Sequence, residues 1–193
     1  MLKTAKLYEE QLQLKLNETI TDPRYRWYHM QAPNTKLVIE DSFWSKIQFV
    51  SVNDEGDVCS YMNASWERPE NTISSLSCIN FDMKKPGLFA NDFRKFLRYL
   101  TVEIDVPKIT FFVIVGNPAE RHYDEIIAKV GGRIVGTFRY DVLIGNRYYD
   151  RKYYEWINEF YRCPYCGNKV YKIATLVCEK CSLGQVYLST PFG

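Results

Sequence analysis

Hydrophobic and polar positions alternate with a short period over much of the first half of the chain. Residues 36–81 contain four segments rich in β-branched and aromatic residues, separated by polar sequences such as Asp54-Glu55-Gly56-Asp57. This pattern predicts an antiparallel meander of four strands joined by short turns. The predicted strands are residues 36–40, 43–53, 57–66 and 72–81.

After residue 84 the spacing of apolar positions predicts an alternation of helices and strands. Residues 90–103 repeat apolar side chains at i, i+3, i+4 and i+7, which form one face of a helix. These side chains are Phe93, Phe96, Leu97 and Leu100. The almost wholly apolar run 108–115 predicts a strand covered on both faces. The remaining predictions are an amphipathic helix at 119–130, closed by Gly131-Gly132, and a strand pair at 133–144 and 148–158.

The N-terminal segment predicts a helix followed by an arm. Residues 3–19 contain neither Gly nor Pro, and Pro23 ends the helix because proline excludes the helical conformation from the residue before it. We interpret the aromatic and basic stretch 24–29 as a segment packed over the core with its polar tips outward. The patterns predict an α+β fold in three parts: a helix and arm at 1–35, a central domain at 36–158 and a tail at 159–193.

Composition and charge narrow the class of protein. The chain has 193 residues, 46% apolar and 25% charged, which is the balance of a globular protein rather than a disordered one. The formal net charge of +2 argues against a nucleic-acid partner. The longest apolar run, 111–115, is far shorter than the ~20 residues of a membrane span, and the N-terminus lacks the apolar region of a secretory signal. The sequence therefore predicts a cytoplasmic protein.

Four of the six cysteines form a pattern typical of a metal site, with the spacing C-x2-C-x11-C-x2-C. They are Cys163, Cys166, Cys178 and Cys181. Two pairs of thiolates can surround one ion as a tetrahedron, which is typical of a closed structural zinc site. The sequence therefore predicts a C-terminal zinc ribbon holding Zn²⁺. The ribbon is either a clip for the tail or a docking surface, for which a protein is the expected partner. Cys59 and Cys78 are expected to be ordinary half-buried residues.

Specific residues carry a family resemblance across 36–158, in addition to the order of the elements. The stretch Val113-Ile114-Val115-Gly116-Asn117-Pro118-Ala119, followed by Tyr123 and by residues 129–137, is similar to the acyl-CoA-binding core of the GNAT acyltransferase superfamily. Residues 145–155 resemble the last two strands of that family. The sequence is also similar to GNAT-like proteins of bacteriophages of low-GC hosts, which include enzymes and non-catalytic virion components. The resemblance implies a mixed, mostly antiparallel sheet whose central strands splay apart around acyl-CoA, flanked by helices.

The resemblance also implies which residues bind acetyl-CoA. The family loop Arg/Gln-x-x-Gly-x-Gly/Ala is matched from Lys84 onward, with Gly87 as the first glycine and Phe89 at the second small position. Lys84, Gly87 and Ala90 are therefore expected at the pyrophosphate, which sits at a helix N-terminus where unpaired N–H groups favour anions. Asn117 matches the asparagine that hydrogen-bonds the cofactor after the fifth family strand.

The implied catalytic acid is Tyr123, which would protonate the departing thiolate. The residue lies one position closer to Asn117 than in the family, and one position rotates a helical side chain by about 100°. His122 is therefore an alternative to Tyr123.

A general base is harder to place, because residues 73–81 contain neither a carboxylate nor a histidine. Glu67 and Asp82, at the two ends of this region, are the candidate substitutes. A water chain ending at the hydroxyl of Tyr61 or Ser75 is a further alternative.

Two functions follow from these expectations. The first is an acyl-CoA-dependent N-acetyltransferase acting on a protein or small-molecule amine, with the zinc tail docking a partner. The second is a non-catalytic GNAT-fold phage protein, which serves as a virion component or binds a host protein in the host cytoplasm. A nucleic-acid-binding module led by the zinc tail is a third, against which the near-neutral charge counts.

Overall fold

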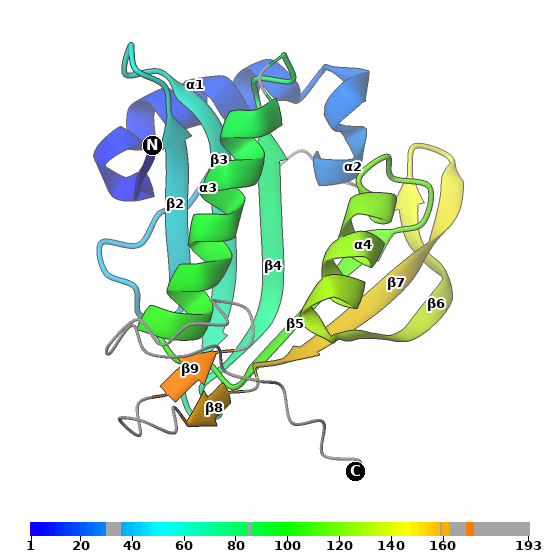
Figure 1. The fold of residues 1–193 in the computed structure, drawn as a ribbon. Coiled ribbons are helices and arrows are strands. Elements are labelled where there is room, and N and C mark those ends of the chain that lie inside the picture. Colours follow the sequence, from blue (N-terminus) through cyan, green and yellow to red (C-terminus); the bar gives the residue numbers. More distant parts are fainter. Residues whose placement is uncertain (30–35, 85, 159, 163–168, 172–193) are drawn as a thin grey trace.

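The computed structural model describes residues 1–29, 36–84 and 86–158, together with the backbone of 160–162 and 169–171 (Figure 1). The helices are α1 (Glu9–Thr19), α2 (Arg26–His29), α3 (Pro86–Arg98) and α4 (Glu120–Val130), with 3₁₀ turns at Ala5–Tyr8 and Pro23–Tyr25 and a π turn at Tyr99–Glu103. The strands are β1 (Leu2–Thr4), β2 (Lys46–Val52), β3 (Val58–Glu67), β4 (Thr72–Asn80), β5 (Lys108–Ile114), β6 (Arg133–Ile144), β7 (Arg147–Ile157), β8 (Phe160–Arg162) and β9 (Lys169–Tyr171).

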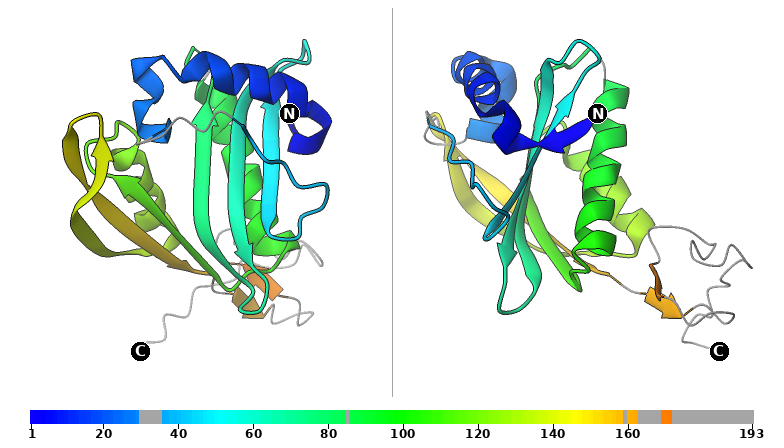
Figure 2. Two further views of the ribbon diagram at one scale, coloured as in Figure 1. Left: turned by 180° about the vertical axis from the view of Figure 1, so that it is seen from behind. Right: turned by 90° about the vertical axis from the view of Figure 1, so that its left-hand side faces the viewer.

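Strands β1 to β7 form one mixed sheet in the order β1-β2-β3-β4-β5-β7-β6. Neighbouring strands run antiparallel, except that β4 and β5 are parallel. Helices α1 and α2 lie on one face of the sheet, and α3 and α4 lie on the other (Figure 2). The predicted α+β fold, with a mostly antiparallel central sheet flanked by helices, is confirmed.

The parallel strands β4 and β5 are paired at one end only. Thr72 pairs with Lys108 and Ile73 with Ile109, and no further pair joins the two strands. Beyond this point they diverge (Figure 1), while each stays paired with its outer neighbour, β3 or β7. The sheet therefore consists of two halves that meet at two residue pairs and open toward the carboxyl ends of β4 and β5.

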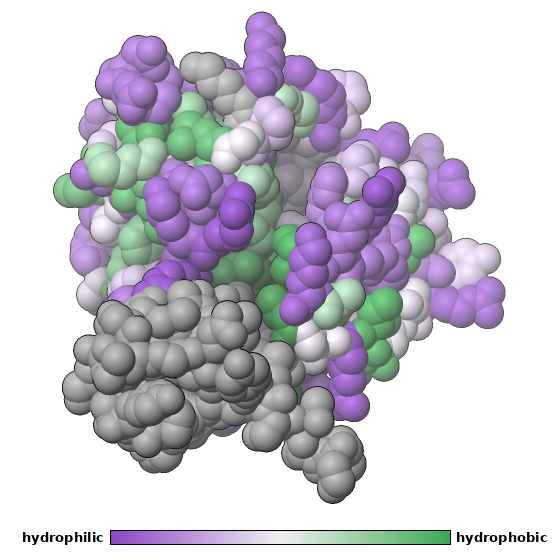
Figure 3. All heavy atoms as spheres, in the orientation of Figure 1, coloured by the Kyte–Doolittle hydropathy of each residue, from purple (hydrophilic) through white to green (hydrophobic). Residues whose placement is uncertain are grey.

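The larger core cluster lies between the sheet and helices α3 and α4. The apolar side chains predicted to form one helical face belong to it: Phe93, Phe96 and Leu97 come from α3 and Leu100 from the following π turn, and Phe96 and Leu100 are fully buried. They pack against side chains of the sheet such as Met62 and Ile109. The outer surfaces of the two helices are hydrophilic, with apolar atoms visible between them (Figure 3).

The N-terminal segment belongs to the same sheet and contributes to a second core cluster. Strand β1 pairs antiparallel with β2 at the edge of the sheet. Ala5 and Leu12 are fully buried in this second cluster together with Val50 and Ile79 of β2 and β4. The helix predicted over 3–19 is confirmed for most of its length, although residues 2–4 form the strand β1 instead.

Two predicted boundaries were wrong for identifiable reasons. Residues 36–40 do not form a strand; instead the side chain of Gln48 donates to the carbonyl of Val38 and accepts from the N–H of Glu40. Hydrogen bonds to this side chain thus replace the backbone hydrogen bonds to a neighbouring strand that residues 36–40 would otherwise need. Helix α3 begins at Pro86 rather than at residue 90, because proline at the first helical position loses no hydrogen bond and has a φ suited to the helix.

The tail is described only as the antiparallel hairpin β8–β9, in which Arg162 pairs with Lys169. Its two strands flank the first cysteine pair, Cys163 and Cys166, in the sequence. The four predicted zinc ligands lie outside the described residues. Within the described part of the chain, no helix is long and apolar enough to cross a membrane.

Candidate functional site

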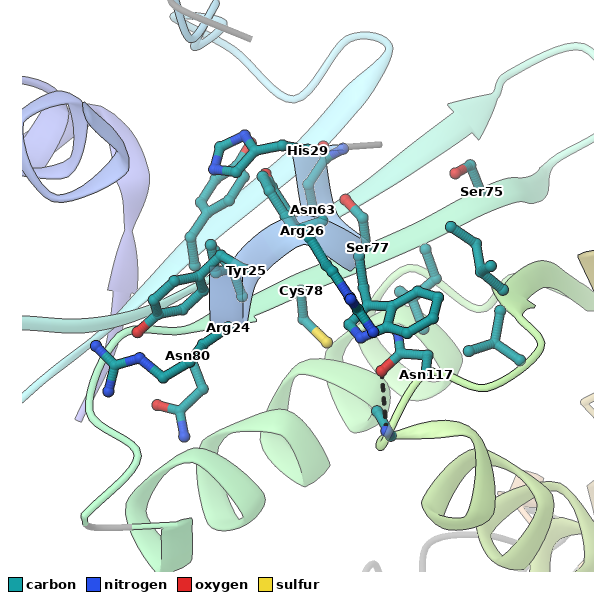
Figure 4. A pocket seen from close by; sticks show the side chains of 18 of the residues that line it. Arg24, Tyr25, Arg26, His29, Asn63, Ser75, Ser77, Cys78, Asn80 and Asn117 are labelled. Atoms are coloured by element: carbon teal, nitrogen blue, oxygen red, sulfur yellow. Dashed lines mark hydrogen bonds between the residues drawn. The ribbon is translucent and has the colours of Figure 1, made fainter. Parts of the chain in front are cut away.

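A cavity of about 1060 Å³ occupies the opening between β4 and β5 (Figure 4). Its walls come from the carboxyl halves of β4 and β5, the turn before α4, the first turn of α3, and the segment 23–29 that contains α2. A volume of this size accommodates a ligand larger than a typical metabolite. The one-ended pairing of β4 and β5 creates the cavity, because the strands separate where their backbones would otherwise form hydrogen bonds.

Both strands direct unpaired backbone groups into this opening. The N–H of Phe81 donates to the carbonyl of Cys59 on β3, and hydrogen bonding alternates along an antiparallel pair. The N–H and C=O groups of Cys78 and Asn80 therefore point away from β3, toward β5. On β5 the N–H of Val115 donates to the carbonyl of Asp150 on β7. Because the direction alternates residue by residue, the N–H and C=O groups of residues 112 and 114 point toward β4. The opening thus offers donors and acceptors to an extended ligand.

Tyr123 reaches this cavity from α4 and contacts β4. Its hydroxyl lies 3.1 Å from the Sγ atom of Cys78, and its ring packs on Phe111 with centroids 5.5 Å apart. Burial raises the pKa of Tyr123 well above its ordinary value, and the neighbouring Cys78 adds to this shift. Burial also raises the pKa of Cys78 to about 11. Both groups therefore carry their protons at neutral pH.

Helix α4 is held in place by charged contacts with β7. Asp124 accepts hydrogen bonds from Lys152, at 3.1 Å, and from the hydroxyl of Tyr154, at 2.7 Å. Lys152 also forms an ion pair with Glu120 at the start of the helix. Because Asp124 follows Tyr123 directly, this network fixes the direction in which Tyr123 points.

Asn117 lies on the cavity wall at the turn between β5 and α4. Its Oδ1 accepts from the N–H of Ala119 at 2.9 Å (Figure 4). Its side-chain NH₂ group has no hydrogen-bond partner among the described residues and is available to a ligand.

The predicted phosphate loop lies at the start of α3, beside the cavity. Gly87 and Ala90 are in the first turns of the helix, and the N–H of Lys84 is held by the carboxylate of Asp82 at 3.1 Å. None of Lys84, Gly87 and Ala90 lines the described cavity, but Phe89 does, with its ring stacked on Phe93 at 5.7 Å. Proline has no N–H, so the first unpaired donors of α3 are those of residues 87 and 88.

The structure does not bring Glu67 to Tyr123. Glu67 ends β3, pairs with Thr72, and accepts from the hydroxyl of Ser74 at 2.6 Å. Its carboxylate therefore lies beside Ser74, four residues or about 13 Å along β4 from Cys78. The alternative acid His122 is also directed elsewhere, since its side chain is 76% exposed and faces Glu125 at 4.0 Å.

The remaining base candidates are Tyr61, Ser75 and Asp82, and they bring no carboxylate to the cavity wall. Tyr61 and Ser75 line the wall. Burial raises the pKa of Tyr61 to about 12, so its hydroxyl is protonated at neutral pH and accepts from Gln48. Asp82 holds the loop before α3 and does not line the cavity.

His29 is a functional candidate that the sequence did not reveal. The hydroxyl of Thr19 donates to the carbonyl of Leu16 at 2.6 Å, so it must accept from Nε2 of His29, which lies 2.8 Å away. Burial lowers the pKa of His29 and keeps the ring neutral. Nδ1 therefore carries a lone pair, and this buried atom has no partner among the described residues. His29 also lines the cavity.

Arg26 and Trp27 were expected only to cover the core, yet they form part of the cavity wall. A Cβ atom at Gly116 would lie 3.7 Å from Trp27, and the Trp27 ring meets Tyr149 edge-on at 5.1 Å. Trp27 thus joins α2 to the half of the sheet that contains β5 and β7. The guanidinium of Arg26 lies over the Trp27 ring, 4.6 Å from its centroid. The aromatic and basic composition of 24–29 was the available signal, but its position depends on this long-range packing.

Within residues 1–29, 36–84 and 86–158, no cluster of three or more metal-ligating side chains occurs. The predicted zinc ligands Cys163, Cys166, Cys178 and Cys181 lie outside these residues. The zinc site therefore stays a prediction from the sequence.

Comparison with known proteins identifies the fold. No family model and no curated protein matches the chain. Among solved structures, the spermidine N-acetyltransferase of Vibrio cholerae in complex with CoA and spermine matches with a TM-score of 0.62 and 16% identity, covering 81% of this chain and 94% of that one. A protein provisionally described as a phosphinothricin N-acetyltransferase matches with a TM-score of 0.60 and 15% identity, over 81% and 97% of the two chains. The predicted GNAT fold is confirmed by these N-acetyltransferase structures.

Proposed function

We propose that the protein is an acyl-CoA-dependent N-acyltransferase that transfers an acetyl group from acetyl-CoA to an amine. The observation that carries the proposal is the opening between β4 and β5, where both strand edges present unpaired backbone groups. The pantetheine arm of CoA is an extended chain with two amide groups, which can pair with such edges as a short strand does. One of the similar structures has CoA bound, in agreement with this proposal.

The residues around the opening suit the separate parts of acetyl-CoA, which supplies the acyl thioester. The N–H groups of residues 87 and 88 at the start of α3 face the pyrophosphate, with Lys84 and Ala90 in the same segment. The NH₂ group of Asn117 donates to the pantetheine arm. Backbone N–H groups of β4 polarise the thioester carbonyl.

Two side chains move the protons of the transfer. The amine nitrogen forms the new C–N bond while the C–S bond breaks, and Tyr123 donates its proton to the leaving sulfur. The raised pKa keeps Tyr123 protonated until then. The amine must lose a proton, and Nδ1 of His29 accepts it through intervening water, since this nitrogen is unprotonated and has no partner among the described residues.

The first test is calorimetric titration of the purified full-length protein with acetyl-CoA. Micromolar binding, followed by release of free thiol when amines are added, is the expected result. Absence of binding at millimolar acetyl-CoA would refute the proposal.

A second candidate is the non-catalytic phage protein, in the virion or bound to a host protein. The observation that favours it is the edge strand β6, whose Ile134, Val135, Phe138 and Tyr140 are 51–68% exposed. Exposed apolar side chains on an unpaired edge are typical of surfaces that contact other proteins. A protein that fails to bind acetyl-CoA but binds a partner through β6 would match this alternative.

For the tail we propose a structural zinc ribbon that docks a protein partner. The antiparallel pairing of β8 with β9 supports it, because these strands flank Cys163 and Cys166 in the sequence, as strands flank the cysteine pair of a zinc ribbon. Metal analysis is expected to find one zinc ion per chain, lost in the Cys163→Ser, Cys178→Ser double variant. Retention of zinc in that variant would contradict the ligand assignment.

A further inference from the structure

The cationic side chains of the cavity wall come from elements other than α3, where the pyrophosphate is proposed to bind, and the proposed function gives them no role. They are Arg24, Arg26, Lys36 and Lys46. Neither Asp nor Glu occurs among the described residues that line the cavity, and the sequence of residues 30–35 contains none. A wall of this sign attracts anions and repels a polycation.

The four cations are not equivalent. Arg24 is engaged by Asp22, which accepts from its Nε at 2.9 Å. Lys46 lies near Glu40, whose carboxylate accepts from the Lys46 backbone N–H at 3.0 Å and interacts electrostatically with the Lys46 ammonium. Within the described part of the chain no ion pair holds Arg26, Lys36 or Lys46, but the charge of Lys46 is partly offset by Glu40. Arg26 and Lys36 are therefore the cations most available to a ligand.

Arg26 is the better placed of the two. Its guanidinium lies 4.6 Å from the centroid of the Trp27 ring, which supports it as a flat cation. In Figure 4 the side chain extends from α2 toward the side of the cavity where Asn117 lies. Helix α2 lies on the opposite face of the sheet from α3 (Figure 2), so Arg26 is separated from the proposed pyrophosphate site. Arg26 can therefore contact a second substrate that shares the cavity with the acyl end of acetyl-CoA, without taking part in the pyrophosphate site.

A second polar group on this wall also has no partner. Oδ1 of Asn63, on β3, is buried and lacks a hydrogen bond among the described residues. A buried carbonyl oxygen requires a donor, which an amine supplies. The wall thus pairs an acceptor suited to an amine with a guanidinium suited to a carboxylate or phosphate.

We infer that the acyl acceptor is a small amine that also carries an anionic group, a carboxylate or a phosphate, which Arg26 binds. This inference rests on the proposed acyltransferase function and specifies its substrate class. It separates this protein from the similar structure that holds spermine, a polycation.

The test compares three amines that differ mainly at one end: β-alanine with a carboxylate, O-phosphoethanolamine with a phosphate and 1,3-diaminopropane with a second amine. Binding is measured by calorimetry with the free and CoA-loaded protein, and transfer by thiol release from acetyl-CoA. We expect one of the anionic amines to bind and react at least about 10-fold better than the diamine, and the better of the two identifies the anion.

Arg26→Ala is expected to lower kcat/KM for the preferred anionic amine about 10- to 100-fold, as loss of a charge-assisted pair does, and to leave the Kd for acetyl-CoA unchanged. The matched control is Arg121→Ala, which removes an exposed cation that pairs with Glu125 outside the cavity wall. A preference of the wild-type protein for the diamine, or no binding of either anionic amine at about 10 mM, would overturn the inference. Equal losses on all three amines would also overturn it. Failure to bind acetyl-CoA refutes the proposed function instead, while amine binding to the free protein still reports the charge preference.

Discussion

The start of α3 offers a direct test of acyl-CoA binding through Gly87. This residue is exposed, and a Cβ atom added to it would meet nothing within 4 Å, so longer side chains fit without strain. At ~6 Å from a pyrophosphate of charge about −2, a carboxylate costs about 1.4 kcal/mol in water and about 5.5 kcal/mol at an effective dielectric constant of 20. Because Gly87 is exposed, we expect Gly87→Glu to weaken acetyl-CoA binding by the lower amount, about 10-fold.

The neutral variant Gly87→Gln is the matched control, because it has nearly the same shape. The stability of Gly87→Glu should be unchanged or rise by about 0.3–1 kcal/mol, since an acidic side chain is favourable in the first turn of a helix. Calorimetry gives the Kd, and urea unfolding gives the free energy of unfolding. Equal acetyl-CoA affinity of the Glu and Gln variants would show that no phosphate lies at this helix end and would refute the assignment.

Three further predictions concern catalysis, pH dependence and packing. Tyr123→Phe should lower kcat about 10²- to 10⁴-fold, as loss of a general acid does, with an unchanged Kd for acetyl-CoA. The free energy of unfolding should fall as the pH drops below 6.5, the ordinary pKa of histidine, because the folded protein keeps His29 neutral while the unfolded chain binds a proton. His29→Gln should reduce this slope, whereas His122→Gln, at an exposed position, should not. Gly132→Ala should destabilise the fold by about 1–3 kcal/mol, because the added Cβ would lie 2.8 Å from the backbone oxygen of Glu155. Gly136→Ala is the control: nothing lies within 4 Å of a Cβ added there, and no such loss of stability is expected.

Each of these predictions has an outcome that contradicts it. Full activity of Tyr123→Phe would remove the proposed acid from the mechanism. Equal slopes of stability against pH in the two histidine variants would mean that His29 does not resist protonation. Melting temperatures of the two glycine variants within about 1 °C of each other would contradict the close approach at Gly132.

Much of the fold was predictable because local patterns and tertiary packing agree. A short stretch of sequence specifies each of three features: the apolar face of α3, the almost wholly apolar strand β5, and the end of α4. Helix α4 ends at Gly131, which adopts a φ of 73°. Strand β1 was missed because three residues carry too little pattern. The strand expected at 36–40 failed because hydrogen bonds to Gln48 take the place of a partner strand.

The site was only partly predictable, because it is assembled by contacts between distant residues. Asn117 and Tyr123 could be named from the sequence, and both line the cavity. Arg26 and His29 could not be singled out, since their role depends on where α2 docks and on the contact between His29 and Thr19. No pattern in β4 indicates that it leaves β5 after Ile73.

The alternation of backbone groups along β4 has a consequence for amide hydrogen exchange. Ile79 and Phe81 direct their N–H groups toward β3, and their hydrogens should exchange slowly. Cys78 and Asn80 direct theirs into the opening, so that fast and slow exchange should follow each other residue by residue within one strand. A ligand that binds as an added strand would slow exchange at alternate residues alone. Exchange rates along β4 would therefore distinguish such a ligand from one that only occupies the space between the two halves of the sheet.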